Sequence, residues 1–258
     1  GMNSQRLLAN SEYVKETIRG KQILKSEHNS KDDDGMKKQE ILNWSYGKLE
    51  TLNLFIPRLL GGSSTEEVSD DFKKELRASL ESQTDDEEQI QAVFDQVANG
   101  VPMYWGDQPG TSGPAYQGAI VVFLAILGFF FAWKKYRYWI LGASILTILL
   151  AWGSNFLPLS DLFIDYVPLY NKFRAPSSIL VVVELLFPLI AIIGLYRFYN
   201  DEKLTEEYKQ KILLYVGGSV LGITLLIILF AKSLFGFEGA AETGKIPDFI
   251  MTVIKDER

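Results

Sequence analysis

Cysteine is absent from the sequence, and histidine occurs only once, as His28. The lack of cysteine excludes disulfide bonds and thiolate chemistry. His28 lies in a polar stretch, SEHNSKDDDG, where a single histidine is typical of a solvated loop and not of a metal ligand. The chain also lacks a phosphate-cradling glycine loop, a zinc-helix motif and a nucleophilic-serine elbow, which argues against the common classes of soluble enzyme. We therefore predict no metal and no cofactor.

Charge is unevenly distributed along the chain. Residues 1–115 hold 13 Lys and Arg against 20 Asp and Glu, whereas residues 116–258 hold 13 against 12. The net acidity of the first half argues against a nucleic-acid-binding surface. Because the second half also holds the long apolar runs, the composition indicates a polar, acidic segment joined to a membrane segment.

Four apolar runs predict membrane-spanning helices. They are residues 116–133, 139–157, 178–199 and 212–231. At about 1.5 Å of rise per residue, each run approaches the ~30 Å thickness of the hydrocarbon core. We predict an all-α fold with four membrane helices in 116–231. Residues 1–115 would form an extracytoplasmic helical and loop domain, and residues 232–258 an extracytoplasmic tail or the start of a further segment.

The orientation follows from the loops between the runs. The first connection, KKYR at 134–137, is short and purely basic, and the loop 200–211 contains Lys203, Lys209 and Lys211. Cytoplasmic loops carry an excess of Lys and Arg, and acidic residues count for little in this bias. We therefore expect both loops to be cytoplasmic.

A helical hairpin outside the membrane is predicted within the first half. Ser64 with Glu67, and Thr84 with Glu87, match capping boxes at the starts of two helices. Apolar residues recur along one face of each helix, namely Val68, Phe72, Leu76 and Leu80 in the first and Ile90, Val93, Phe94 and Val97 in the second. The remaining faces are acidic and solvated.

A candidate phosphate site precedes the third apolar run. Lys172 and Arg174 lie just before Ser177 and Ser178, which begin that run. The start of a helix offers unpaired N–H groups and the positive end of a dipole, and arginine binds phosphate oxygens in a bidentate manner. The pattern indicates either a lipid-linked phosphate or pyrophosphate held at the membrane surface, or plain anchoring to phospholipid headgroups.

Three carboxylates near this stretch are candidates for catalysis. Glu184 lies six residues beyond Ser178, about 9 Å into the helix. An ionised carboxylate facing lipid there would cost about 2–3 kcal/mol or more, so we expect it to face a bundle interior or a polar cavity. It would serve as a base, an acid or a substrate contact, or else form a structural hydrogen bond. Asp161 and Asp165 flank the same loop and are weaker candidates, because loop aspartates usually form turns.

The chain resembles a known family in four strings: RLLANSEYVKETIRG, NWSYGKLETLNLFIPRLLGG, YWGDQPGTSGPAYQGAIV and FIDYVPLYNKFRAPSSILV. Together these are similar to the YfhO-type multipass membrane proteins of Bacteroidota-like bacteria. The resemblance implies a GT-C-like glycosyltransferase of the bacterial cytoplasmic (inner) membrane. Such an enzyme takes a polyprenyl-phosphate sugar donor on the outer face and modifies an envelope glycan or lipid acceptor.

The resemblance also limits which residues can be assigned a role. The acidic residue proposed for catalysis in that family lies in an outer loop near the N-terminus of the longer protein, a region that has no counterpart here. The chain is therefore expected to be an internal fragment and inactive alone, and only the stretch from Phe173 to Ser178 matches a plausible donor-phosphate site.

Two other functions fit the same residues. In a transporter or flippase for a lipid-linked glycan, Glu184 would be a coupling or gating carboxylate. In an envelope scaffold, the outer helices would bind a partner protein. Turnover of a lipid-linked donor would favour the enzyme over both.

Overall fold

The structure, a computed structural model, describes residues 36–113, 115–239 and 246–257, together with residues 9, 12, 13 and 17. Its α-helices are α2 (Lys38–Ile41), α3 (Asp70–Glu81), α4 (Glu87–Gly100), α5 (Ala119–Phe131), α6 (Lys134–Ala151), α7 (Leu157–Tyr166), α8 (Val181–Asn200), α9 (Glu206–Leu234) and α10 (Asp248–Glu257). Short 3-10 helices are η2 (Leu49–Leu54), η3 (Gly153–Phe156), η4 (Tyr170–Lys172) and η5 (Pro176–Leu180). Every regular element in these ranges is helical, so the all-α prediction is confirmed for them. His28 lies outside the described residues.

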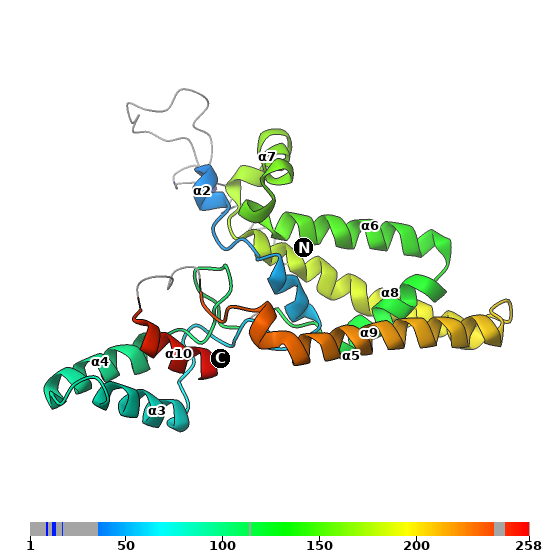
Figure 1. Ribbon diagram of the computed structural model, residues 1–258. Coiled ribbons are helices and arrows are strands. Elements are labelled where there is room, and N and C mark those ends of the chain that lie inside the picture. Colours follow the sequence, from blue (N-terminus) through cyan, green and yellow to red (C-terminus); the bar gives the residue numbers. More distant parts are fainter. Residues whose placement is uncertain are drawn as a thin grey trace.

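Apart from α2 and α7, the helices form two groups (Figure 1): α5, α6, α8 and α9 make an elongated bundle, and α3, α4 and α10 make a smaller cluster beside one end of it. The predicted hairpin is α3 with α4. The apolar stripe of α3 is buried, whereas in α4 only Ile90 is buried and Val93, Phe94 and Val97 are partly buried against the same core. Residues 246–257, which we expected to belong to an extracytoplasmic tail or to the start of a further segment, pack into this cluster. The side chains of Ile250, Met251 and Ile254 join its core, and Glu257 accepts hydrogen bonds from the backbone and side chain of Ser69 at 2.8 Å.

The caps of the hairpin differ from the predicted ones. Ser69 caps α3 and Asp86 caps α4, each with its side chain accepting from backbone N–H groups of the first turn. The predicted cap residues have other partners. The Ser64 hydroxyl accepts a hydrogen bond from the backbone N–H of Thr111 at 2.9 Å, and the Thr84 hydroxyl accepts one from the backbone N–H of Asp86 at 3.2 Å. Both boxes were wrong because these hydroxyls stabilise the loops before the helices.

Two helices are long and apolar enough to cross a membrane, Pro176–Asn200 and Glu206–Ala231. This is fewer than the four that we predicted. The second apolar run is part of a bent pair, Lys134–Ala151 with Gly153–Tyr166, whose axes differ by 113° and which would add a third span if counted as one. The first run forms only the 13 residues of α5. The structure therefore indicates a membrane-associated protein with two, or at most three, such spans among the described residues.

Local hydrogen bonding explains the bend after α6. The backbone N–H of Ser154 donates to the Ser45 hydroxyl at 2.8 Å instead of continuing the helical ladder, and the next N–H, from Asn155, bonds to the Trp152 carbonyl in a 3-10 pattern. Kinks of this kind occur where a side chain inserts into the ladder. The apolar run 139–157 could not predict it, because Ser45 lies far away in sequence.

The bundle is held together most closely between α5 and α8. A Cβ atom added at Gly194 would overlap the backbone of Gly128, and one added at Gly128 would overlap the carbonyl of Ile190. Small residues allow such close backbone approach between membrane helices. Ala125, Leu186 and Ile190 fill the buried interior beside this crossing.

The two ends of the bundle are different. At one end, the loop following α2 binds the end of α6 and the start of η5: Tyr46 N–H donates to the Ala151 carbonyl at 2.8 Å, and Ser177 N–H donates to the Trp44 carbonyl at 3.3 Å. At the other end, the Arg197 side chain binds the Phe131 carbonyl at 2.9 Å, next to the turn between α5 and α6. The two basic loops, 134–137 and 200–211, thus lie at the same end.

Candidate functional site

The turn before α8 forms a small pocket that contains two of the predicted phosphate-binding residues. The pocket has a volume of about 220 Å³ and is lined by Ile41, Tyr170, Phe173, Arg174, Ala175, Pro176, Ser178 and Ile179. Ala175 has a positive φ of 63°, which reverses the chain between Arg174 and η5. Both Arg174 and Ser178 are exposed, so a ligand can reach them from solvent. We call this space the Arg174 pocket.

Arg174 is oriented by an aromatic side chain. Its guanidinium lies over the Trp44 ring, 5.9 Å from the ring centroid, an arrangement that favours the cation electrostatically. The Trp44 indole in turn donates to the Gly110 carbonyl at 2.9 Å. The loops around positions 44 and 110 therefore both support the position of Arg174.

The backbone N–H groups at the start of η5 are less available for binding an anion than the sequence suggested. Pro176 has no N–H, Ser177 N–H donates to the Trp44 carbonyl, and Ser178 N–H donates to the Ala175 carbonyl at 3.0 Å. An anion in the Arg174 pocket would consequently be bound by the Arg174 side chain and the Ser178 hydroxyl. Lys172 and Ser177, the other two predicted residues, are not among the residues that line it.

The three candidate carboxylates are separate from one another. Asp161, on α7, forms an ion pair with Lys38 of α2. Asp165 is exposed on the same helix and has no hydrogen bond or ion pair with any residue of the described ranges. Glu184 is exposed on α8, and its backbone carbonyl accepts a hydrogen bond from Gln117 at 3.0 Å.

The location of Glu184 corrects our expectation that it faces a bundle interior or a polar cavity. Gln117 lies two residues before the start of α5, so the contact places Glu184 level with the beginning of α5. The preceding residues, Pro176–Leu180, form η5 and pack against the end of α6.

Sequence reasoning missed a buried carboxylate at the same end of the bundle. Glu50, in η2, is fully buried. Its side chain accepts hydrogen bonds from the Tyr104 hydroxyl, from the Gly47 N–H and, at 3.4 Å, from the Gln108 amide. The Tyr46 hydroxyl donates to the Glu50 backbone carbonyl at 2.6 Å. We call this arrangement the Glu50 network.

Packing and electrostatics explain how the Glu50 network is maintained. A Cβ atom at Gly106 would overlap both the Tyr104 hydroxyl and the Glu50 carboxylate, so a larger residue there would displace the network. Burial raises the pKa of Glu50, the three donated hydrogen bonds oppose that rise, and Asp107 adds to it. Burial and the nearby Glu50 also raise the pKa of Tyr104 well above its usual value.

The Glu50 network joins two loops that are distant in sequence and adjoin the helical bundle. Because Glu50 is fully buried, it cannot touch a ligand, and its role is to position the loops. Asp107 at its edge is exposed and accepts a hydrogen bond from Asn155 at 3.3 Å. A sequence signal was present in the strings SYGKLE and YWGDQ, but nothing in one sequence shows that they meet.

A second pocket lies between η2 and the helices α5, α6, α8 and α9 and is almost entirely apolar. Its volume is about 320 Å³, and it is lined by Thr51, Leu52, Leu54, Phe55, Val122, Ala125, Ile126, Phe129, Ile148, Phe187, Val220 and Ile223. Its one polar side chain, Thr51, accepts a hydrogen bond from the Trp152 indole at 2.9 Å. Such a lining suits a hydrocarbon chain and offers little to a polar ligand. We call it the apolar pocket.

Among the described residues, no group of three or more His, Cys, Asp or Glu side chains is placed to hold a metal ion. No protein-family model, curated protein or solved structure matches this chain. The resemblance to YfhO-type proteins therefore remains a hypothesis that depends on the four sequence strings.

Proposed function

We propose that this chain is part of an integral membrane glycosyltransferase of the YfhO type. It would use a polyprenyl-phosphate-linked sugar to modify a cell-envelope glycan or lipid, in the bacterial cytoplasmic membrane, with residues 1–115 outside. The observation that carries the proposal is the Arg174 pocket, in which an exposed arginine and a serine meet at the start of a helix long enough to cross a membrane. A polyprenyl-phosphate sugar donor would hold its phosphate at the membrane surface, level with the start of such a helix.

The apolar pocket supports the same proposal from the other part of the donor. A polyprenyl chain is a hydrocarbon, and the pocket between η2 and the membrane helices is lined by apolar side chains except for Thr51. It is also in contact with α5, α6, α8 and α9, so a chain within it would remain at membrane depth. The donor would thus find a cationic site and an apolar site on one protein.

The reaction itself requires two kinds of group. An acceptor hydroxyl attacks the sugar carbon that carries the phosphate, a new glycosidic bond forms, the carbon–oxygen bond to phosphate breaks, and polyprenyl phosphate departs with the electron pair. A carboxylate takes the hydroxyl proton as general base, and a cation stabilises the departing phosphate. Arg174 is suited to the second role. The resemblance implies that the base lies elsewhere in the longer protein, and Glu184, Asp161 and Asp165 remain weaker candidates.

Transfer in detergent tests the proposal. The natural protein that contains this chain, purified without any membrane gradient, is expected to move labelled sugar from a polyprenyl-phosphate donor to an envelope glycan or lipid acceptor. A transporter has no chemistry to perform under these conditions. Absence of transfer with a broad donor panel, together with transbilayer movement of a lipid-linked glycan in vesicles, would contradict the proposal. A scaffold would show neither activity.

A further inference from the structure

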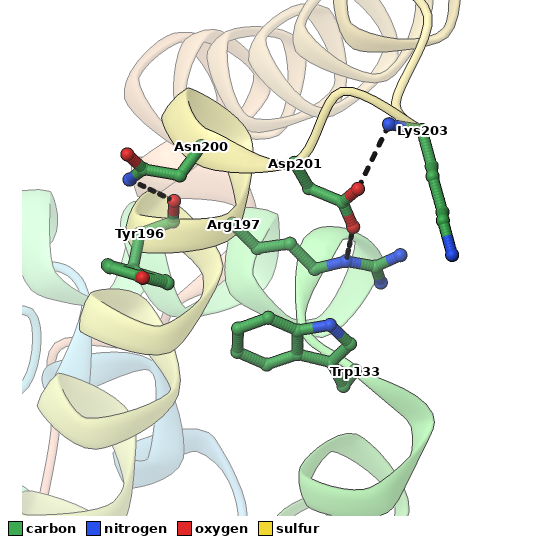
Figure 2. A pocket seen from close by; sticks show the side chains of 6 residues that line it. All are labelled: Trp133, Tyr196, Arg197, Asn200, Asp201 and Lys203. Carbon is green, nitrogen blue, oxygen red and sulfur yellow. Dashed lines mark hydrogen bonds and ion pairs between the residues drawn. The ribbon is translucent and has the colours of Figure 1, made fainter.

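A third pocket lies at the basic end of the bundle, opposite the Arg174 pocket. It has a volume of about 380 Å³ and is lined by Trp133, Tyr196, Arg197, Asn200, Asp201 and Lys203 (Figure 2). These residues come from the last turn of α8, the loop that follows it, and the turn between α5 and α6. We call it the Arg197 pocket. No role in the proposed glycosyl transfer involves it.

Arg197 is held in a fixed position at this pocket. Its Nε donates to the Asp201 carboxylate at 2.6 Å, and its Nη1 donates to the carbonyls of Phe131 at 2.9 Å and Ala132 at 3.3 Å. The guanidinium also lies over the Trp133 ring, 5.7 Å from its centroid. The hydrogen bond from Arg197 lowers the pKa of Asp201, which keeps this pair ionised. The arginine is therefore preorganised and does not need to be ordered by a ligand.

Three donors at the pocket remain without a partner. Within the described part of the chain, no hydrogen bond or ion pair involves Arg197 Nη2, Lys203 Nζ or Trp133 Nε1. Figure 2 shows the Lys203 side chain running alongside the Arg197–Asp201 pair, with its ammonium directed away from the Asp201 carboxylate. The Asp201 carboxylate, in contrast, is occupied by Arg197 and by the backbone N–H of Lys203. An anion that enters the pocket would therefore meet unpaired hydrogen-bond donors, while the Asp201 carboxylate is already occupied.

The surroundings favour an anion at the level of lipid headgroups. Residues 132–137 and 197–211 together carry seven Lys and Arg against four Asp and Glu. Trp133 and Tyr196 are exposed at the point where the span Pro176–Asn200 ends, and such aromatic residues are typical of the membrane–water interface. Basic pockets between membrane helices bind anionic headgroups, because the phosphates lie at this depth.

We propose that the Arg197 pocket binds the phosphate-bearing headgroup of an anionic phospholipid, with Arg197 Nη2 and Lys203 Nζ donating to the phosphate oxygens and the Trp133 ring lying beside the glycerol and first methylene groups. The inference depends only on the membrane helices and the pocket. It holds whether or not the proposed glycosyl transfer is correct.

Lipid retention tests this site. The purified protein in detergent is mixed with phosphatidylglycerol or with phosphatidylcholine of the same acyl chains, and bound lipid is counted by native mass spectrometry. We expect phosphatidylglycerol to bind more tightly. A Lys or Arg near the membrane surface is worth about 1 kcal/mol towards anionic lipid, so Lys203→Gln should weaken that binding about fivefold. Lys203→Arg should retain it.

Lys211→Gln is the matched control. It removes the same charge from the same basic end, but the Lys211 side chain lies over Tyr215, outside the pocket. We expect it to leave phosphatidylglycerol binding unchanged. Equal melting temperatures of wild type and both variants in neutral detergent would show that the pocket mutation does not act through misfolding.

Three outcomes would overturn the proposal. Equal retention of phosphatidylglycerol and phosphatidylcholine would mean that the headgroup charge is not recognised. An equal loss in Lys203→Gln and Lys211→Gln would mean that lipid is attracted by the surface charge and not by the pocket. Protection against heat by free glycerol phosphate, equal to that given by the lipid, would identify a soluble phosphate compound as the ligand.

Discussion

Arg174 has a positive charge and a planar guanidinium that can form paired hydrogen bonds. Replacing it by lysine or by alanine separates the contributions of these two properties to donor binding. If it binds the donor phosphate through paired hydrogen bonds, Arg174→Lys keeps the charge but loses the fork. A charge-assisted hydrogen bond contributes about 1.5–3 kcal/mol, and about 1.4 kcal/mol is a tenfold change in affinity. We expect roughly tenfold weaker donor binding for the lysine variant, and a larger loss for Arg174→Ala. Isothermal titration with a short-chain polyprenyl-phosphate sugar measures both.

Arg77→Lys is the matched control for this experiment. Arg77 lies on α3 and pairs with Glu81 and Glu87 on the surface of the hairpin, so the same exchange there should not affect the donor. Equal donor affinity for wild type, Arg174→Lys and Arg174→Ala, with all three folded, would remove Arg174 from the site. The loop would then be a surface anchor, because lysine anchors to headgroups nearly as well as arginine does.

Because Glu50 is buried, we expect the stability of the folded protein to depend on pH. Burial raises its pKa in the folded protein. A raised carboxyl pKa means that the folded state binds the proton more tightly than the unfolded chain does. The associated stability is complete below the ordinary Glu pKa of about 4.3 and is lost as the pH rises through the folded value. Glu50→Gln cannot ionise but can still accept from Tyr104. Its melting temperature in detergent should therefore rise, relative to wild type, as the pH increases above about 4.3.

Glu66 is the control, because its shift has the opposite sign. The hydrogen bond from Arg58 lowers the pKa of Glu66, so its stabilisation is present above the ordinary Glu pKa and is lost as the pH falls. Relative to wild type, Glu66→Gln should lose stability as the pH increases, by a small amount because the pair is largely exposed. A melting-temperature difference for Glu50→Gln that stays constant with pH would show that Glu50 does not titrate differently in the folded state.

Sequence reasoning succeeded at residues whose neighbours are close in the chain. The periodic apolar residues from Val68 to Val97 pack into one core, buried in α3 and partly buried in most of α4, and Arg174 and Ser178 share a pocket because only a short turn separates them. The Glu50 network could not be predicted, since Tyr104 and Gln108 lie 54 and 58 residues away from Glu50. Periodicity and local spacing carry no information on such pairings.

At the scale of elements, helix identity was predicted more reliably than helix extent. The apolar runs 116–133 and 139–157 both contain helices, yet neither forms a straight span. α5 is limited to residues between Gly118 and Ala132, and α6 ends where Ser45 binds the following turn. A helix that ends because a distant side chain binds its next turn is a tertiary effect. Hydropathy depends only on the residues of the apolar run itself and cannot predict it.

The close contact between α5 and α8 leads us to expect that one added methyl group would destabilise the bundle. At Gly194 a Cβ atom would meet the backbone of Gly128, and backbone cannot move aside as a side chain can. Gly194→Ala should therefore destabilise the bundle by about 1–3 kcal/mol, the usual cost of overpacking. Thermal unfolding in detergent, followed by circular dichroism, measures the change.

Gly142→Ala, in α6, is the matched substitution. No atom of the described residues lies within 4 Å of the Cβ that it would add. The exchange should be neutral or should stabilise α6 by up to about 1 kcal/mol, because alanine favours a helix more than glycine does. If both alanine variants unfold at the same temperature, the α5–α8 crossing is not as close in solution as it is in this structure.

At the scale of the whole molecule, the two ends of the bundle differ in the charge of the segments that adjoin them. The Arg174 pocket, the Glu50 network and the acidic hairpin adjoin one end, and the basic loops and the Arg197 pocket form the other. We propose that this polarity orients the protein in the membrane with its basic end towards the cytoplasm. The lipid-linked donor would then bind on the outer face, and the anionic phospholipid on the inner one.

Single cysteines test this orientation cleanly, because the chain has no cysteine of its own. Ser82, at the end of α3, and Glu202, in the loop after α8, are both exposed. On intact cells, an impermeant thiol reagent should label Ser82→Cys and should label Glu202→Cys only after the membrane is permeabilised. Replacing Glu202 removes no positive charge, so the substitution leaves the basic bias intact. Labelling of Glu202→Cys alone would invert the orientation and place the Arg174 pocket inside, which would contradict a donor site on the outer face. Labelling of both on intact cells would show that no membrane separates the hairpin from the basic loops, and both proposed lipid sites would then lose their physical basis.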